Sequence, residues 1–355
     1  MRILHCIPSL GDGGAERQLS YLAPALVARG CEVHVVLLQE GANAERFSGG
    51  AVVLHRLKRG GNHDPRLVTD LRRVIRQVRP HVVQSWLPQM DVLAGMAVFM
   101  DQIPWIVSER ACAEAYNGSW KLTLRRWLAR RATAIVANSA GGAAYWRSAI
   151  GRRTPIHVIP NAVPTGEIAD VRPASAIDGP FVLSIGRLTE QKNMQVIISA
   201  FSRVASRTEA KLILCGEGHL RSQLEQQIAD LGLRQGVTLP GVVRPVMSLL
   251  KAAALFVSSS IFEGHPNSVI EAIACGCPLV VSDIPAHREF LDEQTARFCR
   301  PSDSAAFAEA IVETLADSAA AGRRADTAKK ILDRLTPDGI AARFHDVYRS
   351  VVAVP

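Results

Sequence analysis

Short apolar runs alternate with amphipathic helical patterns along most of the chain, and this alternation constrains the fold more than any other feature. Arg2–Ile7 is a strand candidate, and Glu16–Arg29 has the apolar spacing of a helix, which Gly30 ends. Glu32–Leu38 then predicts the next strand. Strands and helices that follow one another in this way form βαβ units, so the sequence predicts an α/β fold with a mostly parallel sheet.

The alternation stops between residues 159 and 180 and then restarts. The strand Phe181–Ile185 and the helix Asn193–Val204, which has one apolar stripe, begin the second series. Prolines mark the break as a linker between domains: Pro160, Pro164, Pro173 and Pro180.

We therefore expect two doubly wound, Rossmann-like α/β domains that face a central cleft. They cover residues 1–165 and 170–338, and a closing helix over 340–355 joins the first domain. Ligands of such sheets bind at the carboxyl ends of the strands. The functional residues are accordingly expected on the loops that directly follow strands.

The formal net charge of +8 is concentrated in the first half of the 355 residues. Residues 1–165 hold 21 Lys and Arg against 11 Asp and Glu, whereas the remainder holds 20 against 22. A basic half suits an anionic membrane, an acidic acceptor or nucleic acid, and a solvated basic surface is the alternative. Aromatic residues are only 5% and no nucleic-acid motif is present, so no nucleic-acid partner is expected.

Neither a membrane span nor an export signal is expected from the sequence. The longest uncharged apolar runs, such as 92–100, are far shorter than the roughly 18 residues of a span. The apolar start is followed at once by Asp12, so the cytoplasm is the expected location. The seven cysteines are odd in number and irregularly spaced, which predicts neither a zinc site nor a disulfide framework.

Two cations follow the strand Phe181–Ile185, on a loop that begins with Gly186. Arg187 and Lys192 precede a helix, whose N-terminus carries unpaired N–H groups and about half a positive charge. Each cation taken alone could be an ordinary surface residue. Their position at the carboxyl end of a strand favours a diphosphate-binding site.

A second loop follows the strand that ends near Ser258, and it carries Glu263. Glu271 lies one or two turns inside the next helix, which we expect to start near Asn267 or Ser268, either of which is a good N-cap. A carboxylate there can accept both hydroxyls of a ribose, while the helix amides hold phosphate. The apolar neighbours of Glu271 argue against an exposed helix residue.

These loops resemble those of the retaining family 4 glycosyltransferases of the GT-B fold. The segments G-R-L-x-x-x-K-N from Gly186 and E-G-x-P-N-x-x-x-E-A from Glu263 are highly specific matches. The segments at 13–17, 158–163 and 215–218 are weaker matches that occur in the same order. The similarity spans Leu4 to about Asp283 and points to bacterial members that act on polysaccharides or lipid-linked glycans.

The resemblance implies transfer of a sugar from a nucleotide sugar to a glycan or lipid-linked acceptor, with retention of the anomeric configuration. UDP-sugars are the commonest donors in the family. The first domain would take the acceptor and the second the donor. Arg187 and Lys192 would bind the diphosphate, Glu263 would lie near the transferred sugar, and Glu271 would bind the ribose. The other donor-binding residues that it implies are Gly13, Gly14, Gly186, Gly264, Pro266, Asn267 and Ser268.

No metal or cofactor is expected, because the family needs none and the D-x-D pattern of metal-dependent glycosyltransferases is absent. Catalysis then depends on fixed cations that stabilise the departing diphosphate more than the ground state. Arg187→Ala or Lys192→Ala is predicted to lower kcat on the order of a hundredfold, with the fold intact.

The chain departs from many relatives where they carry a histidine, and it has Ser108-Glu109-Arg110 instead. The resemblance puts Glu109 or Arg110 on the acceptor side, and the sequence does not decide which. Helix capping or a salt bridge is the alternative role for either residue.

The segment 120–131 predicts a basic amphipathic helix with two tryptophans. Trp120 and Trp127 share one helical face with leucines, and basic residues take most of the other faces. Such a helix suits an anionic membrane surface, or it docks its apolar face on the sheet, and the sequence leaves both readings open.

Two other enzyme classes and one non-enzymatic class compete with this interpretation. A dinucleotide-dependent dehydrogenase would use Gly11 and Gly13, but Glu16 stands where its fingerprint has glycine. A nucleotide-sugar epimerase shares the fold. A membrane or nucleic-acid scaffold would use the basic half but leaves the donor motifs unexplained.

Overall fold

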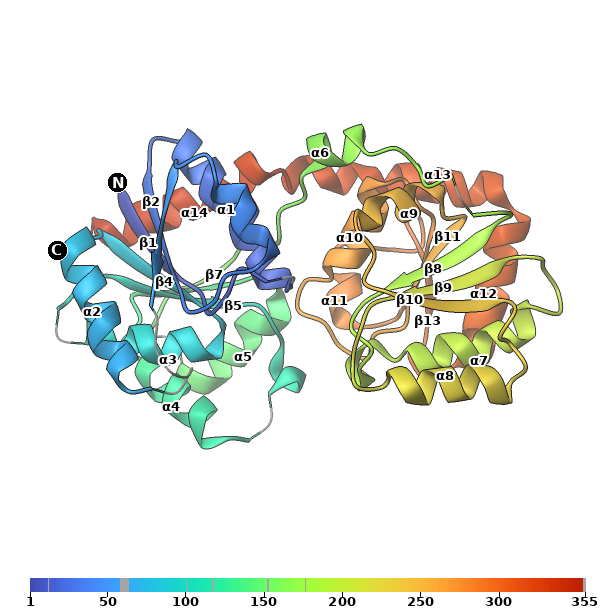
Figure 1. The fold of residues 1–355 in the computed structure, drawn as a ribbon, viewed down its shortest axis with the longest axis horizontal. Helices are drawn as coiled ribbons and strands as arrows, with labels where there is room; N and C mark the ends of the chain where they lie inside the picture. Colours follow the sequence, from blue (N-terminus) through green and yellow to red (C-terminus); the bar gives the residue numbers. More distant parts are fainter. Residues whose placement is uncertain are drawn as a thin grey trace. The chain divides into compact units, whose positions relative to one another are not determined.

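The chain folds into two compact units, each with its own parallel sheet (Figure 1). Unit 1 comprises Met1–Ala162 and Arg334–Pro355, and unit 2 comprises Val163–Asp333. The predicted pair of doubly wound sheets is confirmed. This computed structural model describes residues 1–11, 13–57, 64–99, 101–116, 118–151, 153–175 and 177–353.

Seven strands of the described chain form the sheet of unit 1, and all their pairings are parallel. Because the strands are parallel, their carboxyl ends meet at one edge of the sheet. The spatial order is β3 (Val52–Arg56), β2 (Glu32–Leu37), β1 (Arg2–Cys6), β4 (Val82–Trp86), β5 (Trp105–Glu109), β6 (Ala134–Ala137) and β7 (Ile156–Val158).

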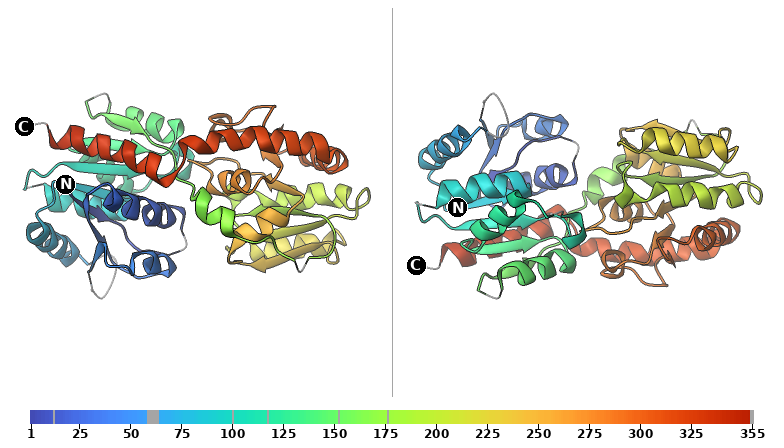
Figure 2. Two further views of the ribbon diagram at one scale, coloured as in Figure 1. Left: turned by 90° about the horizontal axis from the view of Figure 1, so that it is seen from above. Right: turned by 90° about the horizontal axis from the view of Figure 1, so that it is seen from below.

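Helices cover both faces of this sheet (Figures 1 and 2). One face holds α1 (Gly14–Ala28) and α14 (Pro337–Val352), and the aromatic rings of Phe344 and Tyr348 on α14 pack toward the sheet. The apolar core on the opposite face is built by α2 (Arg66–Val78), α3 (Leu87–Val98), α4 (Trp120–Ala129) and α5 (Ala140–Ile150).

The described part of unit 2 forms a six-stranded parallel sheet with the same doubly wound arrangement. Its strand order is β10 (Val237–Gly241), β9 (Lys211–Cys215), β8 (Phe181–Ile185), β11 (Leu255–Ser258), β12 (Leu279–Ser282) and β13 (Arg297–Cys299).

The main core of unit 2 lies between this sheet and α7 (Met194–Val204), α8 (Arg221–Asp230) and α12 (Ser304–Ala316). On the other face are α9 (Val246–Ala252), α10 (Asn267–Ala274) and α13 (Ser318–Lys329) (Figure 1). The short helices α6 (Thr165–Asp170) and α11 (Pro285–Arg288) complete the unit.

Several predicted elements differ from those observed. The sequence pattern over 328–335 predicts a helix, whereas the structure has α13, which begins ten residues earlier because Asp317 caps it by accepting from the amide of Ala320. The closing helix begins at Pro337, where the Thr336 side chain caps it and proline occupies the first turn. Within the described residues, none of the helices has the length and apolar character needed to cross a membrane.

Candidate active site

The loop after β8 is held in place by Asn193, the residue that precedes α7. Asn193 adopts a left-handed conformation with φ of 52°. Its side-chain amide donates to the carbonyls of Ser259 at 3.2 Å and Pro301 at 2.8 Å. The loops that follow β8, β11 and β13 are thereby fastened together at the carboxyl edge of the sheet of unit 2.

Two glycines after β9 allow its loop to lie directly on the loop after β8. A Cβ on Gly216 would fall 1.9 Å from the carbonyl oxygen of Gly186, and the φ of +142° at Gly216 also requires glycine. A Cβ on Gly218 would fall 2.3 Å from the carbonyl oxygen of Leu188. The 215–218 motif therefore shapes the neighbouring loop that carries Arg187.

Glu263 is the centre of the polar contacts at this edge. Its Oε1 accepts hydrogen bonds from the ammonium of Lys192 and from the hydroxyl of Ser260, the latter at 2.7 Å. Gln191 donates to the carbonyl of Phe262 at 3.0 Å and to Oε2 of Glu263 at 3.4 Å. Arg187 donates to Gln191 Oε1 at 3.3 Å, so Gln191 links the predicted cation to the predicted acid.

The ion pair sets the charge state of Glu263. Burial acts to raise the pKa of this carboxyl, but Lys192 and the Ser260 hydroxyl outweigh it and hold the pKa below its ordinary value. Glu263 is therefore a carboxylate at neutral pH. The sequence predicted two cations on this loop, and the structure shows that Lys192 is paired with Glu263 while Arg187 is exposed.

The helix α10 begins at Asn267, where the sequence predicted its start, but the expected N-cap differs. Pro266 is the residue that precedes the helix, and Asn267 and Ser268 lie in its first turn and do not cap it. Gly264 is buried in the loop. Glu271 is buried in the second turn of α10, as expected for a residue inside the helix.

Sequence reasoning missed Gln191 and Ser260, both of which contact Glu263. Each is a common polar residue whose type alone suggests no role. Gln191 lies 72 positions before Glu263 in the sequence, and Ser260 lies three positions before it. The signal that could have found them is their position after β8 and β11, the same signal that identified Arg187 and Glu263.

In unit 1, Gly13 and Gly14 lie at the start of α1, on the loop after β1. Gly13 directly precedes the helix and Gly14 is its first residue. The Glu16 carboxylate lies over Gly13, where a Cβ would fall 2.1 Å from Oε2. Ser9 donates to the other carboxylate oxygen of Glu16 at 3.2 Å. The glycines thus put the N-terminal amides of α1 at the carboxyl edge of the sheet, where anions bind.

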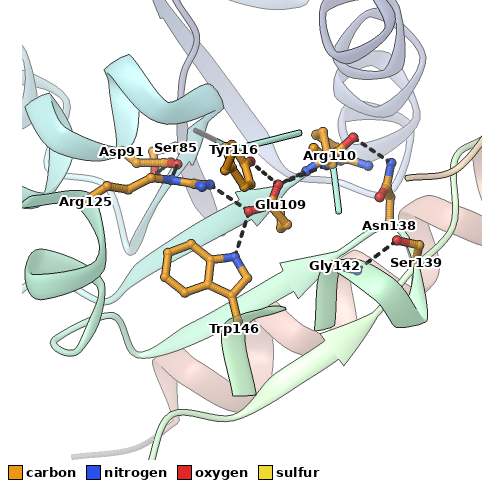
Figure 3. Close-up of polar contacts among 11 residues, drawn as sticks. Ser85, Asp91, Glu109, Arg110, Tyr116, Arg125, Asn138, Ser139, Gly142 and Trp146 are labelled. Atoms are coloured by element: carbon orange, nitrogen blue, oxygen red, sulfur yellow. Dashed lines mark hydrogen bonds and ion pairs between the residues drawn. The ribbon is translucent and has the colours of Figure 1, made fainter. Parts of the chain in front are cut away.

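Glu109, one of the two acceptor-side candidates, is fully buried in a network of donors (Figure 3). Its Oε1 accepts from the amides of Arg110 and Ala111 at 2.8 and 2.9 Å and from the Tyr116 hydroxyl at 2.5 Å. The other oxygen, Oε2, accepts from the Trp146 indole at 2.9 Å. This oxygen lies 3.0 Å from Nη2 of Arg125. The salt-bridge alternative is therefore the one that the structure supports for Glu109.

Arg125 connects Glu109 to a second buried acid. Its Nε donates to Asp91 at 2.7 Å, and Ser85 donates to the same carboxylate at 2.6 Å. Burial, as the largest effect, raises the pKa of Asp91 to about 6. This network holds the loop after β5 onto α3 and α4, and it occupies both oxygens of the Glu109 carboxylate.

Arg110 has its guanidinium at the carboxyl end of β5 and is only partly covered. The guanidinium lies 4.2 Å from the centre of the Trp86 ring, and Nη1 donates to Asn161 Oδ1 at 3.0 Å. Of the two candidates, Arg110 is therefore the residue whose charged group reaches the edge of the sheet.

The helix α4 has both an inward face and an exposed aromatic face. Leu128 and Arg125 are buried, whereas Trp120 and Trp127 are 71% and 50% exposed. The Arg131 guanidinium lies 3.9 Å from the centre of the Phe99 ring, which is also exposed. Docking onto the core and an outward aromatic and basic surface thus occur on the same helix.

All seven cysteines are free thiols. Within the described residues there is no group of three or more His, Cys, Asp or Glu side chains placed to hold a metal ion.

Comparisons with known proteins agree with this geometry. Residues 12–167 match the family described as Glycosyltransferase Family 4, and residues 179–317 match Glycosyl transferases group 1. The lipopolysaccharide core biosynthesis glycosyltransferase LpsE of Rhizobium meliloti (strain 1021) is 27% identical, over 90% of this chain and 91% of the relative.

A second relative has a longer and more specific name. It is the N-acetylgalactosamine-N,N'-diacetylbacillosaminyl-diphospho-undecaprenol 4-alpha-N-acetylgalactosaminyltransferase of Campylobacter jejuni subsp. jejuni serotype O:2 (strain ATCC 700819 / NCTC 11168). It is 27% identical over 78% of this chain and 79% of the relative.

Among solved structures, Anabaena HepE in complex with UDP and glucose superimposes with a TM-score of 0.87 and 21% identity, covering 99% of this chain and 100% of that one. At this identity the likeness shows the fold. The two family matches, which together span most of both units, the full-length relatives and the motif loops at the sheet edges agree: the chain belongs to the family 4 glycosyltransferases of the GT-B fold.

Proposed function

We propose that this glycosyltransferase moves a sugar from a UDP-sugar to a glycan or lipid-linked acceptor, with retention of the anomeric configuration and without a metal ion. The observation that carries the proposal is the Arg187–Gln191–Glu263–Lys192 cluster at the carboxyl edge of unit 2, next to the N-terminus of α10. Cations and helix amides in that position stabilise a departing diphosphate.

The choice of UDP and of the acceptor class draws on the relatives. Anabaena HepE has been solved with UDP and with UDP-glucose, which supports a UDP-sugar donor. The Rhizobium relative is named for lipopolysaccharide core biosynthesis and the Campylobacter relative for a diphospho-undecaprenol substrate. Both names support an acceptor that is a bacterial glycan or a lipid-linked sugar.

In this proposal Arg187 and Lys192 bind the donor diphosphate and Glu271 binds the ribose. Glu263 lies near the transferred sugar, and its pairing with Lys192 fixes the ammonium beside the leaving group. Gly186, Gly264, Pro266, Asn267 and Ser268 shape the same donor site. Gly13 and Gly14 are the donor-binding residues that we propose on unit 1. Unit 1 takes the acceptor.

A thermal-shift panel tests the donor assignment. UDP is expected to raise the melting temperature more than GDP or ADP, because a ligand that binds the native state stabilises it. Equal shifts for all three nucleotides would contradict the choice of UDP. Hydrolysis of several UDP-sugars in the same buffer separates an enzyme from a binding scaffold. Unchanged turnover after EDTA treatment tests metal independence, and NMR of the anomeric proton of the product tests retention.

We also propose that the exposed face of α4 contacts the anionic inner surface of the cell membrane. Trp120 and Trp127 are exposed there, and Lys121 and Arg131 lie beside the rings. Tryptophan together with basic residues suits the interface of an anionic bilayer. Binding to phosphatidylglycerol vesicles that salt weakens, and its loss in Trp120→Ala/Trp127→Ala, is the expected result. Equal indifference to anionic and neutral vesicles would contradict this surface.

A further inference from the structure

Arg110 is a cation without a counter-charge at the carboxyl edge of unit 1. Its guanidinium rests on the Trp86 ring, with the Phe344 ring 6.0 Å away. Among the described residues, it donates a hydrogen bond only to the neutral amide of Asn161. Nε is shut off from water and has no hydrogen-bond partner. Within the described residues, no carboxylate forms an ion pair with this guanidinium.

The neighbouring acid forms no ion pair with this guanidinium, although its charge acts to raise the pKa of Arg110. Both oxygens of Glu109 are taken up by Arg125, Tyr116, Trp146 and two backbone amides. Burial lowers the pKa of Arg110 to about 9, which reflects how poorly its charge is solvated. A charge held in such surroundings is costly unless an opposite charge meets it, and perturbed groups of this kind gather at binding sites.

The surroundings of Arg110 add further donors. The helix α5 begins beside it, with Ser139 as the N-cap that accepts from the amide of Gly142 at 3.1 Å. Gly142 is required for this approach, because a Cβ there would fall 2.9 Å from the carbonyl oxygen of Ala111. The loop that carries Arg110 therefore lies directly on the N-terminal turn of α5, whose partial positive charge favours anions.

The Asn138 side chain, next to this N-terminus, makes fewer and longer hydrogen bonds than its amide group allows. It is buried, and its amide nitrogen makes only two long contacts of 3.5 Å, to the carbonyl of Arg110 and to Asn161 Oδ1. Its oxygen has no partner. The amide nitrogen, whose two contacts are long, is the atom that can donate to an oxyanion, whereas the unmatched oxygen is an acceptor that can pair only with a donor such as a ligand hydroxyl.

We propose that Arg110, Asn138 and the N-terminal turn of α5 form an oxyanion-binding subsite that takes a phosphate or carboxylate group of the acceptor. The assignment to the acceptor rests on the proposed function, in which unit 1 takes the acceptor and the diphosphate-binding cations lie on unit 2. Glu109 is then a positioning residue, since it holds the backbone of Arg110 and Ala111. With this subsite, the enzyme prefers acceptors that carry an anionic group.

The test uses the full chain with saturating UDP, so that the predicted diphosphate site is occupied. Methyl phosphate is titrated and followed by phosphorus NMR, and carbon-labelled acetate is titrated in a parallel series at the same ionic strength. Saturable binding of at least one probe is expected, and Arg110→Gln should weaken it by about tenfold, the usual value of a hydrogen bond to a charged group. Preference for one probe distinguishes a phosphate from a carboxylate.

The matched control is Arg147→Gln, which removes the same charge from the far end of α5, where Arg147 is exposed. Binding that is equal in Arg110→Gln and wild type, or lost equally in Arg147→Gln, would overturn the proposal. So would binding that is seen only when UDP is left out of the titration, because the anion would then belong to the donor site. If Arg110→Gln fails to fold, Arg110→Lys provides the comparison, since it keeps a charge but removes the forked donor geometry.

Transfer kinetics link the subsite to the reaction. Arg110→Lys is expected to raise KM for an anionic acceptor by about tenfold with a smaller change in kcat. A fall in kcat alone would oppose a binding role. If the wild-type protein neither binds nor hydrolyses any nucleotide sugar, the proposed function fails, while the methyl phosphate titration still decides the subsite.

Discussion

The Lys192–Glu263 pair couples the donor site to the stability of unit 2, and Lys192→Met measures that coupling. The substitution keeps an apolar stem of similar length and removes the ammonium. It leaves Glu263, whose side chain is 9% exposed, with only Ser260 and Gln191 as donors. Breaking a buried pair from one side costs about 3–5 kcal/mol. The two remaining donors place this case near the lower end, at about 3 kcal/mol.

The stability that Lys192→Met loses should be greater at high pH than at low pH. In the wild type the folded pKa of Glu263 is depressed, so its contribution to stability is present above the unfolded pKa of about 4.3 and is lost as the pH falls through the folded pKa. Without Lys192, burial is expected to raise the pKa of the carboxyl. The stability deficit of Lys192→Met relative to wild type should therefore be largest at about pH 8 and shrink at about pH 5, where the acid takes up a proton.

Hydrogen exchange read by mass spectrometry is the suitable assay, because it reports unit 2 by peptide. All five tryptophans lie in unit 1, so tryptophan fluorescence reports only that unit and serves as the internal control. Peptides from β11 and α10 should exchange about a hundredfold faster in Lys192→Met at about pH 8, after correction for intrinsic rates. The double variant Lys192→Met/Glu263→Gln should recover most of this loss.

Three outcomes would refute the reasoning. They are exchange equal to that of the wild type at pH 8, a deficit that does not shrink with falling pH, or a double variant no better than the single one. Each would mean that Lys192 and Glu263 do not depend on one another in the folded protein. The sequence alone predicted that a Lys192 substitution would leave the fold intact, and the buried pair adds the expectation that this fold is less stable.

Three further predictions concern other parts of the site. Arg187→Gln should lower kcat at saturating donor on the order of a hundredfold without a change in melting temperature, because Arg187 is exposed; near-normal turnover would remove it from the diphosphate site. Gly216→Ala should destabilise unit 2 by about 3 kcal/mol or more in hydrogen-exchange measurements, because the new Cβ would lie 1.9 Å from the Gly186 carbonyl oxygen. The control is Gly322→Ala in α13, where no atom lies near the new Cβ, and it should be neutral or stabilising. Arg125→Met should destabilise unit 1 by about 3–5 kcal/mol in unfolding followed by tryptophan fluorescence, because it leaves the buried carboxylates of Asp91 and Glu109 without their cation. A decrease of less than about 1 kcal/mol in the free energy of unfolding would show that the network is not stabilising.

The elements that the sequence missed share a physical cause. The helix α3 was not predicted because it is apolar nearly all round, being buried against β4, α2 and α4, and so has no polar face to set a helical period. The start of α13 was missed because its alanine-rich first turn has no apolar stripe, although Asp317 is a recognisable N-cap. The spacing of apolar residues reveals a helix only where one face of the helix is buried and the other is in water.

The sequence by itself determined the two series of βαβ units and the loops that carry the donor motifs. It could do so because parallel strands bring all their carboxyl ends to one edge, so position after a strand predicts location. Only the tertiary structure decided the partner of each charge. Lys192 meets an acid 71 positions away and Arg125 meets two buried acids on other elements, so which cation stays free depends on the groups that replace water around it. Desolvation is a property of the packed surroundings and not of the order of residues along the chain.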